Sequence, residues 1–140
     1  MNQNIKIISN TVDAKLSVES QSLKTLFKNS LLGMNQLLKR DYRKNLDGDL
    51  IFSEIEIFSY DSTSLLLNFL SEILALSHST HIIFCSIQFL VLTDKYLLVK
   101  ISGTKIDKFD NDLRTVSFHN AEIIKNQNGN YQTDIIFDYR

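Results

Sequence analysis

The sequence contains no proline and no tryptophan, one cysteine and only four glycines in 140 residues. A single cysteine, Cys85, cannot form a disulfide within the chain, which is typical of proteins from a reducing compartment. The scarcity of glycine and proline leaves no stretch that resembles a flexible linker, so one domain is predicted over residues 1–140. The amino terminus lacks a basic segment followed by an apolar run, so no secretory signal is expected and the cytoplasm is the expected location.

An excess of charge of one sign is also lacking. The chain has 15 basic and 16 acidic side chains, for a formal net charge of −1. This balance argues against a chain-wide electrostatic surface for nucleic acid or membrane, while a local patch stays open. Hydrophobic residues make up 44% and charged residues 22%, which is ordinary for a globular protein of a size that can bury its own core.

Several catalytic motifs are missing as well. Gly103 is isolated, so there is no phosphate-binding glycine loop, and there is no Gly-x-Ser-x-Gly elbow. His78, His81 and Cys85 have the spacing His-x-x-His-x-x-x-Cys, which could offer zinc three ligands. Structural zinc sites usually carry closely paired ligands on both sides of a loop, so the better interpretation is two exposed histidines and a small buried thiol.

The most apolar periodic segment runs from Asp61 to Leu76. Its leucine, isoleucine and phenylalanine residues recur at three- and four-residue spacing, which predicts a buried helix with Asp61 or Ser62 as its cap. About four turns are too few to span a bilayer. Glu72 falls on the narrow polar face of this helix.

The remaining segments predict a second helix and about seven strands. The helix is opened by Ser20 or Ser22 and is expected to end near Leu38. Polar loops are expected at 41–48, 77–80 and 102–112. The expected strands are Ile5–Ile8, 14–18, 51–57, Ile82–Leu92, Tyr96–Ile101, Val116–Ile124 and Tyr131–Asp138. Two long helices packed on a largely antiparallel or mixed sheet make an α+β fold.

Carboxylates at the two ends of the chain are the best candidates for a site. Asp134 and Asp138 project to the same face of the last expected strand. Asp138 follows an apolar run, where an isolated charge needs a partner. Asp13 begins the second strand after a polar turn. Two carboxylates that meet in a cleft could hold a hard cation such as Ca²⁺, while the alternative is that both are solvated residues at strand ends.

Five segments spread over the chain form an ordered set of motifs. They are Asn10-Thr11-Val12-Asp13, Ser22-Leu23-Lys24-Thr25-Leu26-Phe27, Leu65-Leu66-Leu67-Asn68-Phe69-Leu70-Ser71-Glu72-Ile73-Leu74, Leu113-Arg114-Thr115-Val116-Ser117-Phe118-His119 and Ile135-Ile136-Phe137-Asp138-Tyr139-Arg140. In this order, and with this chain length, the set resembles the archease family. No segment is specific by itself, but together they span nearly the whole chain.

The resemblance implies an α+β protein that acts with an RtcB-type RNA ligase. Such a ligase joins a 3′-phosphate or cyclic-phosphate RNA end to a 5′-hydroxyl, after it guanylylates its own histidine with GTP and Mn²⁺. Archeases promote that step and multiple turnover in tRNA splicing and RNA repair. The resemblance therefore implies an activator rather than an enzyme, with the ligase as protein partner and RNA only as an indirect one.

The resemblance also implies site residues. Asp13 and Asp138 would bind a metal, expected to be Ca²⁺, with the backbone carbonyl of Tyr139 as a third ligand. Asp13 and Asp138 would form an acidic tip of the molecule. Glu72 and Arg114 would lie near this tip and contact the ligase.

Further residues have supporting roles by resemblance or by pattern. His119 is a weaker candidate for the ligase contact, because its alternation with Val116 also suits a half-buried sheet residue. Asn10 and Asp134 would support the metal ligands from behind. An independent hydrolase built on the acidic residues and His119 is disfavoured, because nothing resembles an activated nucleophile.

The sequence departs from the family pattern at three positions. Asn10 replaces the usual histidine, Phe69 the usual tryptophan and Arg114 the usual lysine. Phenylalanine keeps the packing role, arginine keeps the charge but not the shape, and asparagine removes a titratable group. The alternative function is therefore a chaperone-like protein-interaction module that has lost the metal site.

Overall fold

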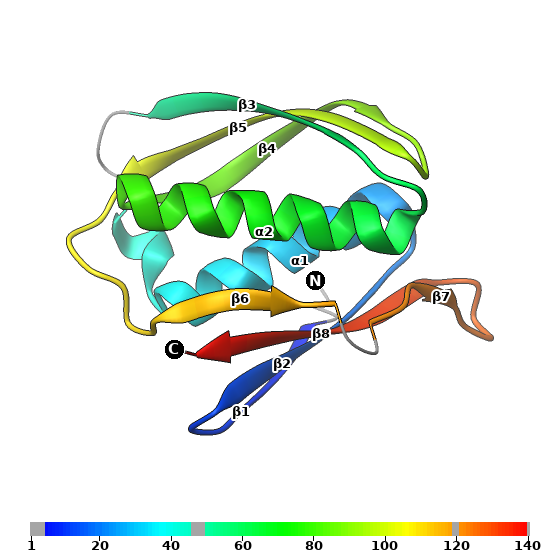
Figure 1. The fold of residues 1–140 in the computed structure, drawn as a ribbon, viewed down its shortest axis with the longest axis horizontal. Helices are drawn as coiled ribbons and strands as arrows, with labels where there is room; N and C mark the ends of the chain where they lie inside the picture. Colours follow the sequence, from blue (N-terminus) through cyan, green and yellow to red (C-terminus); the bar gives the residue numbers. More distant parts are fainter. Residues whose placement is uncertain (1–4, 46–49, 119–120, 140) are drawn as a thin grey trace.

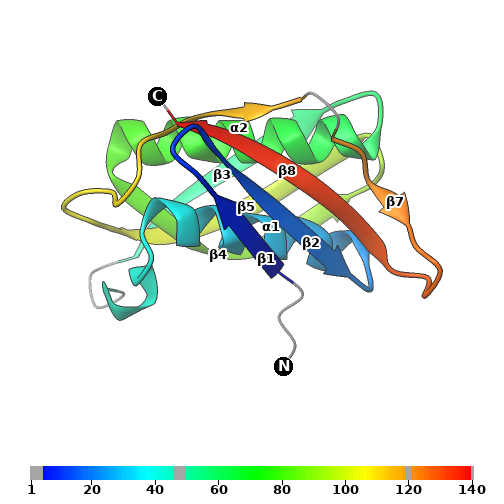
Figure 2. The same ribbon diagram turned by 90° about the horizontal axis from the view of Figure 1, so that it is seen from below.

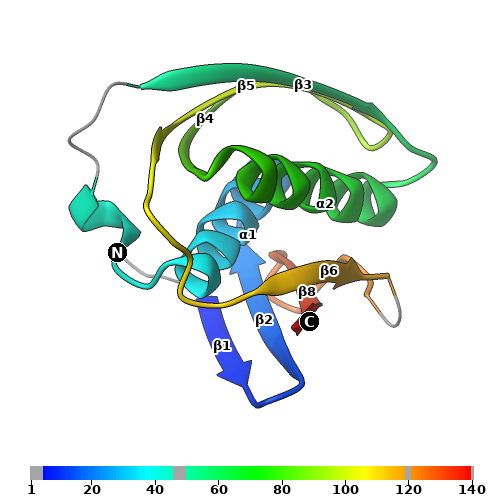
Figure 3. The same ribbon diagram turned by 60° about the vertical axis from the view of Figure 1, so that its left-hand side comes forward.

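In the computed structural model, which describes residues 5–45, 50–118 and 121–139, two helices lie between two sheets (Figures 1 and 3). One sheet has the strand order β1-β2-β8-β6 with the short β7 also paired to β8, and the other has the order β3-β5-β4. The elements are β1 (Ile5–Ser9), β2 (Asp13–Ser20), α1 (Leu23–Leu38), the 3₁₀ helix η1 (Tyr42–Asn45), β3 (Ile51–Phe58), α2 (Ser62–Thr80), β4 (Ile82–Leu92), β5 (Tyr96–Lys105), β6 (Leu113–Ser117), β7 (Ile124–Lys125) and β8 (Tyr131–Tyr139). The α+β class is confirmed, but eight antiparallel strands in two sheets replace the expected single sheet of about seven.

Both predicted helices are present with their expected caps. The Ser22 hydroxyl accepts from the Thr25 N–H at the start of α1, and the Asp61 carboxylate accepts from the Ser64 N–H at the start of α2. Each cap satisfies a backbone donor that the first turn leaves free. The apolar faces of both helices are buried in one core between the two sheets.

The prediction of a loop at 77–80 is wrong, because α2 continues to Thr80. The Ser79 and Thr80 hydroxyls donate to the Leu76 carbonyl, so these polar side chains bond back to the helix. His81 then ends the helix with φ 58°, and its N–H donates to the Ser77 carbonyl. A left-handed residue at this position closes a helix even when it is not glycine.

Two expected strand boundaries are also wrong. β5 continues to Lys105, through residues expected to form a polar connection, because the beginning of β4 pairs with them. The long strand expected at Val116–Ile124 is divided into β6 and β7, which pair with opposite ends of β8. The loop expected at 41–48 contains η1, and residues 46–49 lie outside the described residues.

The pairing of β2 with β8 brings the two ends of the sequence together. Their register runs from Asp13 opposite Asp138 to Ser20 opposite Tyr131. Side chains on one face of both strands are buried under the helices, and those on the other face are less buried and mostly polar, with Ile136 as an apolar exception. Figure 2 shows the two strands side by side. At the far end, hydrogen bonds from Asn130 and Asn126 to the Glu19 carboxylate lower the pKa of Glu19.

No helix among the described residues is both long and apolar enough to cross a membrane.

Candidate functional site

Two carboxylates face each other at one end of the paired strands β2 and β8, in the middle of the five-stranded sheet. Asp13 is the first residue of β2, Asp138 is the penultimate residue of β8, and the two are register partners. Directly opposed residues have Cβ atoms about 4.5–5.5 Å apart, and like charges in this position destabilise the sheet. Both residues are half-buried. The structure therefore brings together the two acidic residues that the sequence singled out.

The two carboxylates have no basic partner in the described part of the chain. The Arg114 guanidinium pairs instead with Asp112, at 3.4 Å. The Thr115 hydroxyl donates to an Asp138 carboxylate oxygen at 3.3 Å, and this is a neutral donor. Two opposed carboxylates without a cation fit a hard divalent ion, whose charge would relieve their repulsion.

Protein side chains alone would not complete such a site. Among the described residues, histidine, cysteine, aspartate and glutamate nowhere form a group of three or more that could hold a metal ion. Ca²⁺ takes about six to eight oxygen ligands, and backbone carbonyls and water commonly supply several of them. A metal between Asp13 and Asp138 would therefore depend on ligands of that kind.

Tyr139 connects the end of β8 to the β1–β2 turn at two points. Its N–H donates to the Val12 carbonyl at 3.1 Å, and its phenol hydroxyl is hydrogen-bonded to the Ser9 hydroxyl. In Figure 2 the carboxyl-terminal end of β8 lies beside this turn. These two bonds hold Asp138, the residue before Tyr139, against the turn that carries Asp13.

Asn10 shapes the same turn. Its side-chain carbonyl accepts from the N–H groups of Val12 (2.7 Å) and Asp13 (2.9 Å), and its own N–H donates to the Asp13 carbonyl (3.0 Å). Asparagine commonly stabilises turns through such bonds to its own backbone. Asn10 thus orients Asp13 through the main chain, a role that does not require the titratable group of a histidine.

Removing the Asn10 side chain should loosen the turn and the site. Asn10→Ala is expected to lower the free energy of unfolding by about 1 kcal/mol, because two backbone donors lose their acceptor. It should also weaken Ca²⁺ binding, as measured by calorimetric titration. Asn128→Ala, at an exposed turn residue far from the tip, is the matched control and should change neither quantity. If Asn10→Ala leaves both the free energy of unfolding and the Ca²⁺ affinity unchanged, the Asn10 side chain does not hold the turn or the site.

A β-bulge at Arg114 was not expected from the sequence. Leu113 is opposite Tyr139 and Thr115 is opposite Asp138, so Arg114 is the extra residue in β6. Bulges re-aim side chains and often lie next to functional sites. The bulge places Thr115 beside Asp138, a contact that the sequence did not predict. It leaves Arg114 exposed and paired with Asp112.

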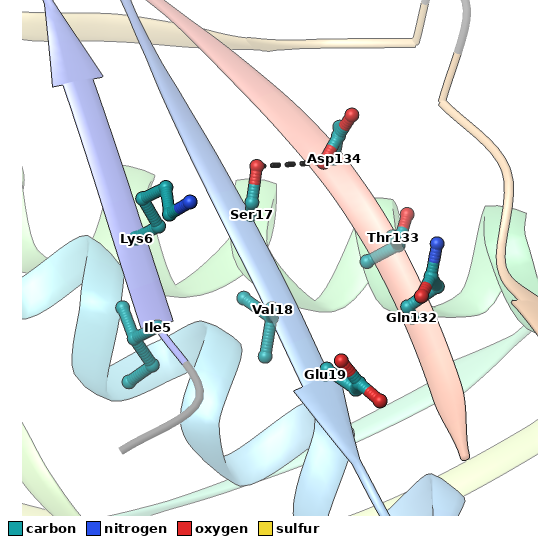
Figure 4. A pocket seen from close by; sticks show the side chains of 8 residues that line it. All are labelled: Ile5, Lys6, Ser17, Val18, Glu19, Gln132, Thr133 and Asp134. Atoms are coloured by element: carbon teal, nitrogen blue, oxygen red, sulfur yellow. Dashed lines mark hydrogen bonds between the residues drawn. The ribbon is translucent and has the colours of Figure 1, made fainter. Parts of the chain in front are cut away.

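The other predicted site residues do not join the carboxylates. Glu72 is exposed on α2, as its polar face predicted, and has no hydrogen bond or ion pair with the described residues. Asp134 accepts a hydrogen bond from the Ser17 hydroxyl at 2.7 Å (Figure 4). It lies four residues before Asp138, about 13 Å along an extended strand. His119 lies outside the described residues.

The sequence did not single out Arg40, a positively charged residue that lies near Tyr139 in the structure. A hollow of about 510 Å³ adjoins Tyr139 and Ser9, and Arg40, just after α1, is in its wall. The Arg40 N–H donates to Asp110, while its guanidinium has no ion pair among the described residues. Arg40 therefore adds an exposed cation to the wall of the hollow at Tyr139.

Of the two histidines interpreted as exposed, His81 is exposed and His78 is half-buried, and both have structural partners. The His78 ring is half-buried and hydrogen-bonded to the Leu113 carbonyl, and both His78 and His81 pack against Phe109. They tie the end of α2 to the segment that leads into β6. Cys85 lies in β4, and partial burial raises the pKa of its thiol. A metal cluster of these three residues is not present in the structure.

Comparisons with known proteins agree with this fold. A model of the Archease protein family (MTH1598/TM1083) matches residues 6–139. The solution structure of Methanobacterium thermoautotrophicum protein 1598 matches with a TM-score of 0.77 and 23% identity, over 98% of this chain and 99% of that one. No protein with a curated description matches significantly.

Proposed function

Because this chain belongs to the archease family, we propose that it activates an RtcB-type RNA ligase in tRNA splicing and RNA repair. In this role it promotes guanylylation and multiple turnover of the ligase and is not itself a catalyst. The partner is the ligase, RNA is contacted only through it, and the compartment is the cytoplasm.

The pairing of Asp13 with Asp138 across β2 and β8 is the observation that carries this proposal. These carboxylates and the backbone carbonyl of Tyr139 would hold a divalent ion, with Ca²⁺ as the expected one. When bound, the ion would neutralise the opposed carboxylates and offer a positive centre at the tip. The two carboxylates oppose each other without a basic partner in the described part of the chain, and this supports a divalent ion as their partner.

The surrounding residues have distinct roles in this proposal. Asn10 fixes the turn that carries Asp13, Thr115 orients Asp138 through its hydroxyl, and Tyr139 ties the end of β8 to the turn. Arg114 and Glu72, which are exposed, would contact the ligase rather than the metal. His119 remains a candidate for the same contact, and Asp134 would act on the site only at a distance.

Multiple-turnover ligation by an RtcB-type ligase from the same source tests the proposal. Wild-type protein should raise both turnover and ligase guanylylation, and Asp138→Ala should abolish the increase because it removes one of the two charged ligands. Asp94→Ala, at an exposed residue of the β4–β5 turn, should stimulate like wild type. An Asp138→Ala protein that stimulates fully would refute the metal-dependent mechanism.

The alternative is an interaction module that no longer depends on metal. It is favoured by Asn10, whose side chain serves the turn where the family pattern has histidine, and by Arg114, which pairs with Asp112. If wild-type protein leaves its cognate ligase unchanged in both turnover and guanylylation, this alternative replaces the activator function.

A further inference from the structure

The outer face of the three-stranded sheet is not covered by any described element (Figures 1 and 3). The inner face of β3 and β5 packs onto the helices through buried residues such as Ile55 and Val99. Because side chains alternate along a strand, the intervening residues point away from the core. An antiparallel sheet with one wet face normally carries polar residues there.

This outer face instead carries large exposed apolar side chains among its polar ones. The exposed fraction is 70% for Phe52 and 72% for Phe58, and the Phe58 ring stacks on Tyr96 with centroids 4.5 Å apart. Leu98 lies on the same face of β5, opposite Val91 of β4, which is 38% exposed. A cluster of adjoining apolar side chains on a rigid sheet, here Phe58, Tyr96, Leu98 and Val91, is typical of a protein–protein interface.

The outer face of the other sheet provides the contrast. Its central row across β1, β2 and β8 is Lys6, Ser17 and Asp134, which is the ordinary polar pattern (Figure 4). The central row of the three-stranded sheet, Glu54, Lys100 and Gln88, is also polar, so the two faces differ in the exposed aromatic residues Phe52 and Phe58 near the two ends of β3.

Both signs of charge also lie side by side on this outer face. Glu54 on β3 is the register partner of Lys100 on β5, both are exposed, and neither forms an ion pair among the described residues. Glu56 accepts a hydrogen bond from the Tyr96 hydroxyl at 2.6 Å, which fixes that ring. A face with adjacent opposite charges can be complementary to itself, whereas a purely acidic or basic face cannot.

We propose that this face is an interface with a second copy of the same chain. The two sheets pack face to face about a two-fold axis that runs parallel to the strands, between β3 and β5. Because Glu54 is level with Lys100 and Phe58 is level with Tyr96, this axis places Glu54 of each copy over Lys100 of the other. The same axis places Phe58 of each copy over Tyr96 of the other.

Pairing of two β3 edges is less compatible with the same residues. An antiparallel β3–β3 pair centred on Ile55 would bring Phe52 opposite Phe58 but Glu54 opposite Glu56. Like charges directly opposite each other destabilise a sheet pair. The charges thus oppose edge pairing, as they do on many protected edge strands, and favour the face-to-face arrangement.

The proposed interface does not involve the acidic tip. Asp13 and Asp138 belong to the five-stranded sheet, on the far side of the helices from the β3–β5 face (Figure 3). A dimer formed through the three-stranded sheet would therefore leave both tips available. The test of this dimer is therefore independent of the test of the ligase-activating function.

Charge reversal followed by sedimentation equilibrium tests the arrangement. The wild-type protein should show a concentration-dependent monomer–dimer equilibrium. Glu54→Lys alone and Lys100→Glu alone should each weaken dimerisation by at least about tenfold, because each places like charges across the interface twice. An equimolar mixture of the two variants should dimerise again, since every cross-interface contact then joins opposite charges.

The mixture separates an interface effect from a folding defect. Within each variant, the change also sets like charges beside each other on β3 and β5, and mixing cannot repair that. Circular dichroism verifies folding, and Lys6→Glu on the other sheet is the matched charge-reversal control, which should dimerise like wild type. Phe58→Ser should weaken the dimer at unchanged charge.

Three results would overturn the inference. One is a wild-type protein that stays monomeric up to roughly 0.5 mM, a concentration at which even a weak interface associates. Another is dimerisation that neither charge reversal changes, or that mixing fails to recover. The third is loss of the dimer on addition of EDTA, which would locate the interface at the metal-binding tip instead.

Discussion

Asp138→Asn is expected to stabilise the metal-free protein slightly and to abolish its stabilisation by Ca²⁺. In the metal-free state, Asp13 and Asp138 are opposed like charges without a basic partner among the described residues. Such a pair costs about 0.2–1 kcal/mol, and asparagine removes that cost with almost no change of shape. The variant should therefore melt at the same or a slightly higher temperature in EDTA.

In the presence of Ca²⁺ the wild-type protein should instead melt at a higher temperature than Asp138→Asn. A ligand that binds only the folded state stabilises it by RT ln(1 + [L]/Kd), which is about 2.7 kcal/mol at 100 times Kd. For a chain of this size such a gain raises the melting temperature by several degrees. The wild-type protein should show this rise, and Asp138→Asn should not, because the remaining single carboxylate holds the ion poorly.

Two further variants make this experiment specific. Asp13→Asn should behave like Asp138→Asn, and the double variant should add little to either, since both act on one site. Asp94→Asn should keep the full gain from Ca²⁺. A metal-free Asp138→Asn protein that melts well below wild type would mean that the carboxylate has a structural role. An undiminished Ca²⁺ effect in that variant would place the metal elsewhere.

The sequence was informative where a local pattern decides the structure. The apolar periodicity of α2 and the caps Ser22 and Asp61 depend on neighbours within one or two turns, and both predictions are confirmed. The alternation in β2 and β8 likewise predicted which residues are buried. The strand pattern left the meeting of Asp13 with Asp138 as one of two interpretations, the resemblance to the family made it the expected one, and the register of the two strands provides it.

The sequence was less informative where partners far apart in the chain decide. One strand was expected over Val116–Ile124, but β6 and β7 are separate because they pair with opposite ends of β8. The bulge at Arg114 depends on the register of β6 against β8, so Thr115 could not be recognised as a neighbour of Asp138. The division into two sheets likewise depends on which strands the helices separate, and hairpin signals do not contain that information.

Gly103→Ala is expected to cause a large loss of stability. Gly103 is buried in β5 opposite Phe84 of β4, and a Cβ atom added there would lie 1.9 Å from the Ile83 carbonyl oxygen and 2.8 Å from the Phe84 Cα. These atoms belong to the backbone, so no side-chain rotation relieves the clash. The two strands would have to separate.

The displacement would extend beyond the strand pair. The Asn35 side chain on α1 donates to the Phe84 carbonyl at 2.8 Å, so moving this part of β4 strains a buried hydrogen bond to the helix. We expect Gly103→Ala to lower the free energy of unfolding by at least about 3 kcal/mol, as measured by urea denaturation.

Gly129 provides the matched comparison for this change. A Cβ atom there meets nothing within 4 Å, and the only obstacle is its φ of 79° in the turn before β8. Gly129→Ala should therefore cost only about 1 kcal/mol, the usual penalty of a left-handed non-glycine residue. A Gly103→Ala protein that unfolds within about 1 kcal/mol of wild type would show that β4 and β5 can separate at Gly103 without loss of the core. The larger loss instead implies that close contact between these two strands holds the three-stranded sheet onto the helices.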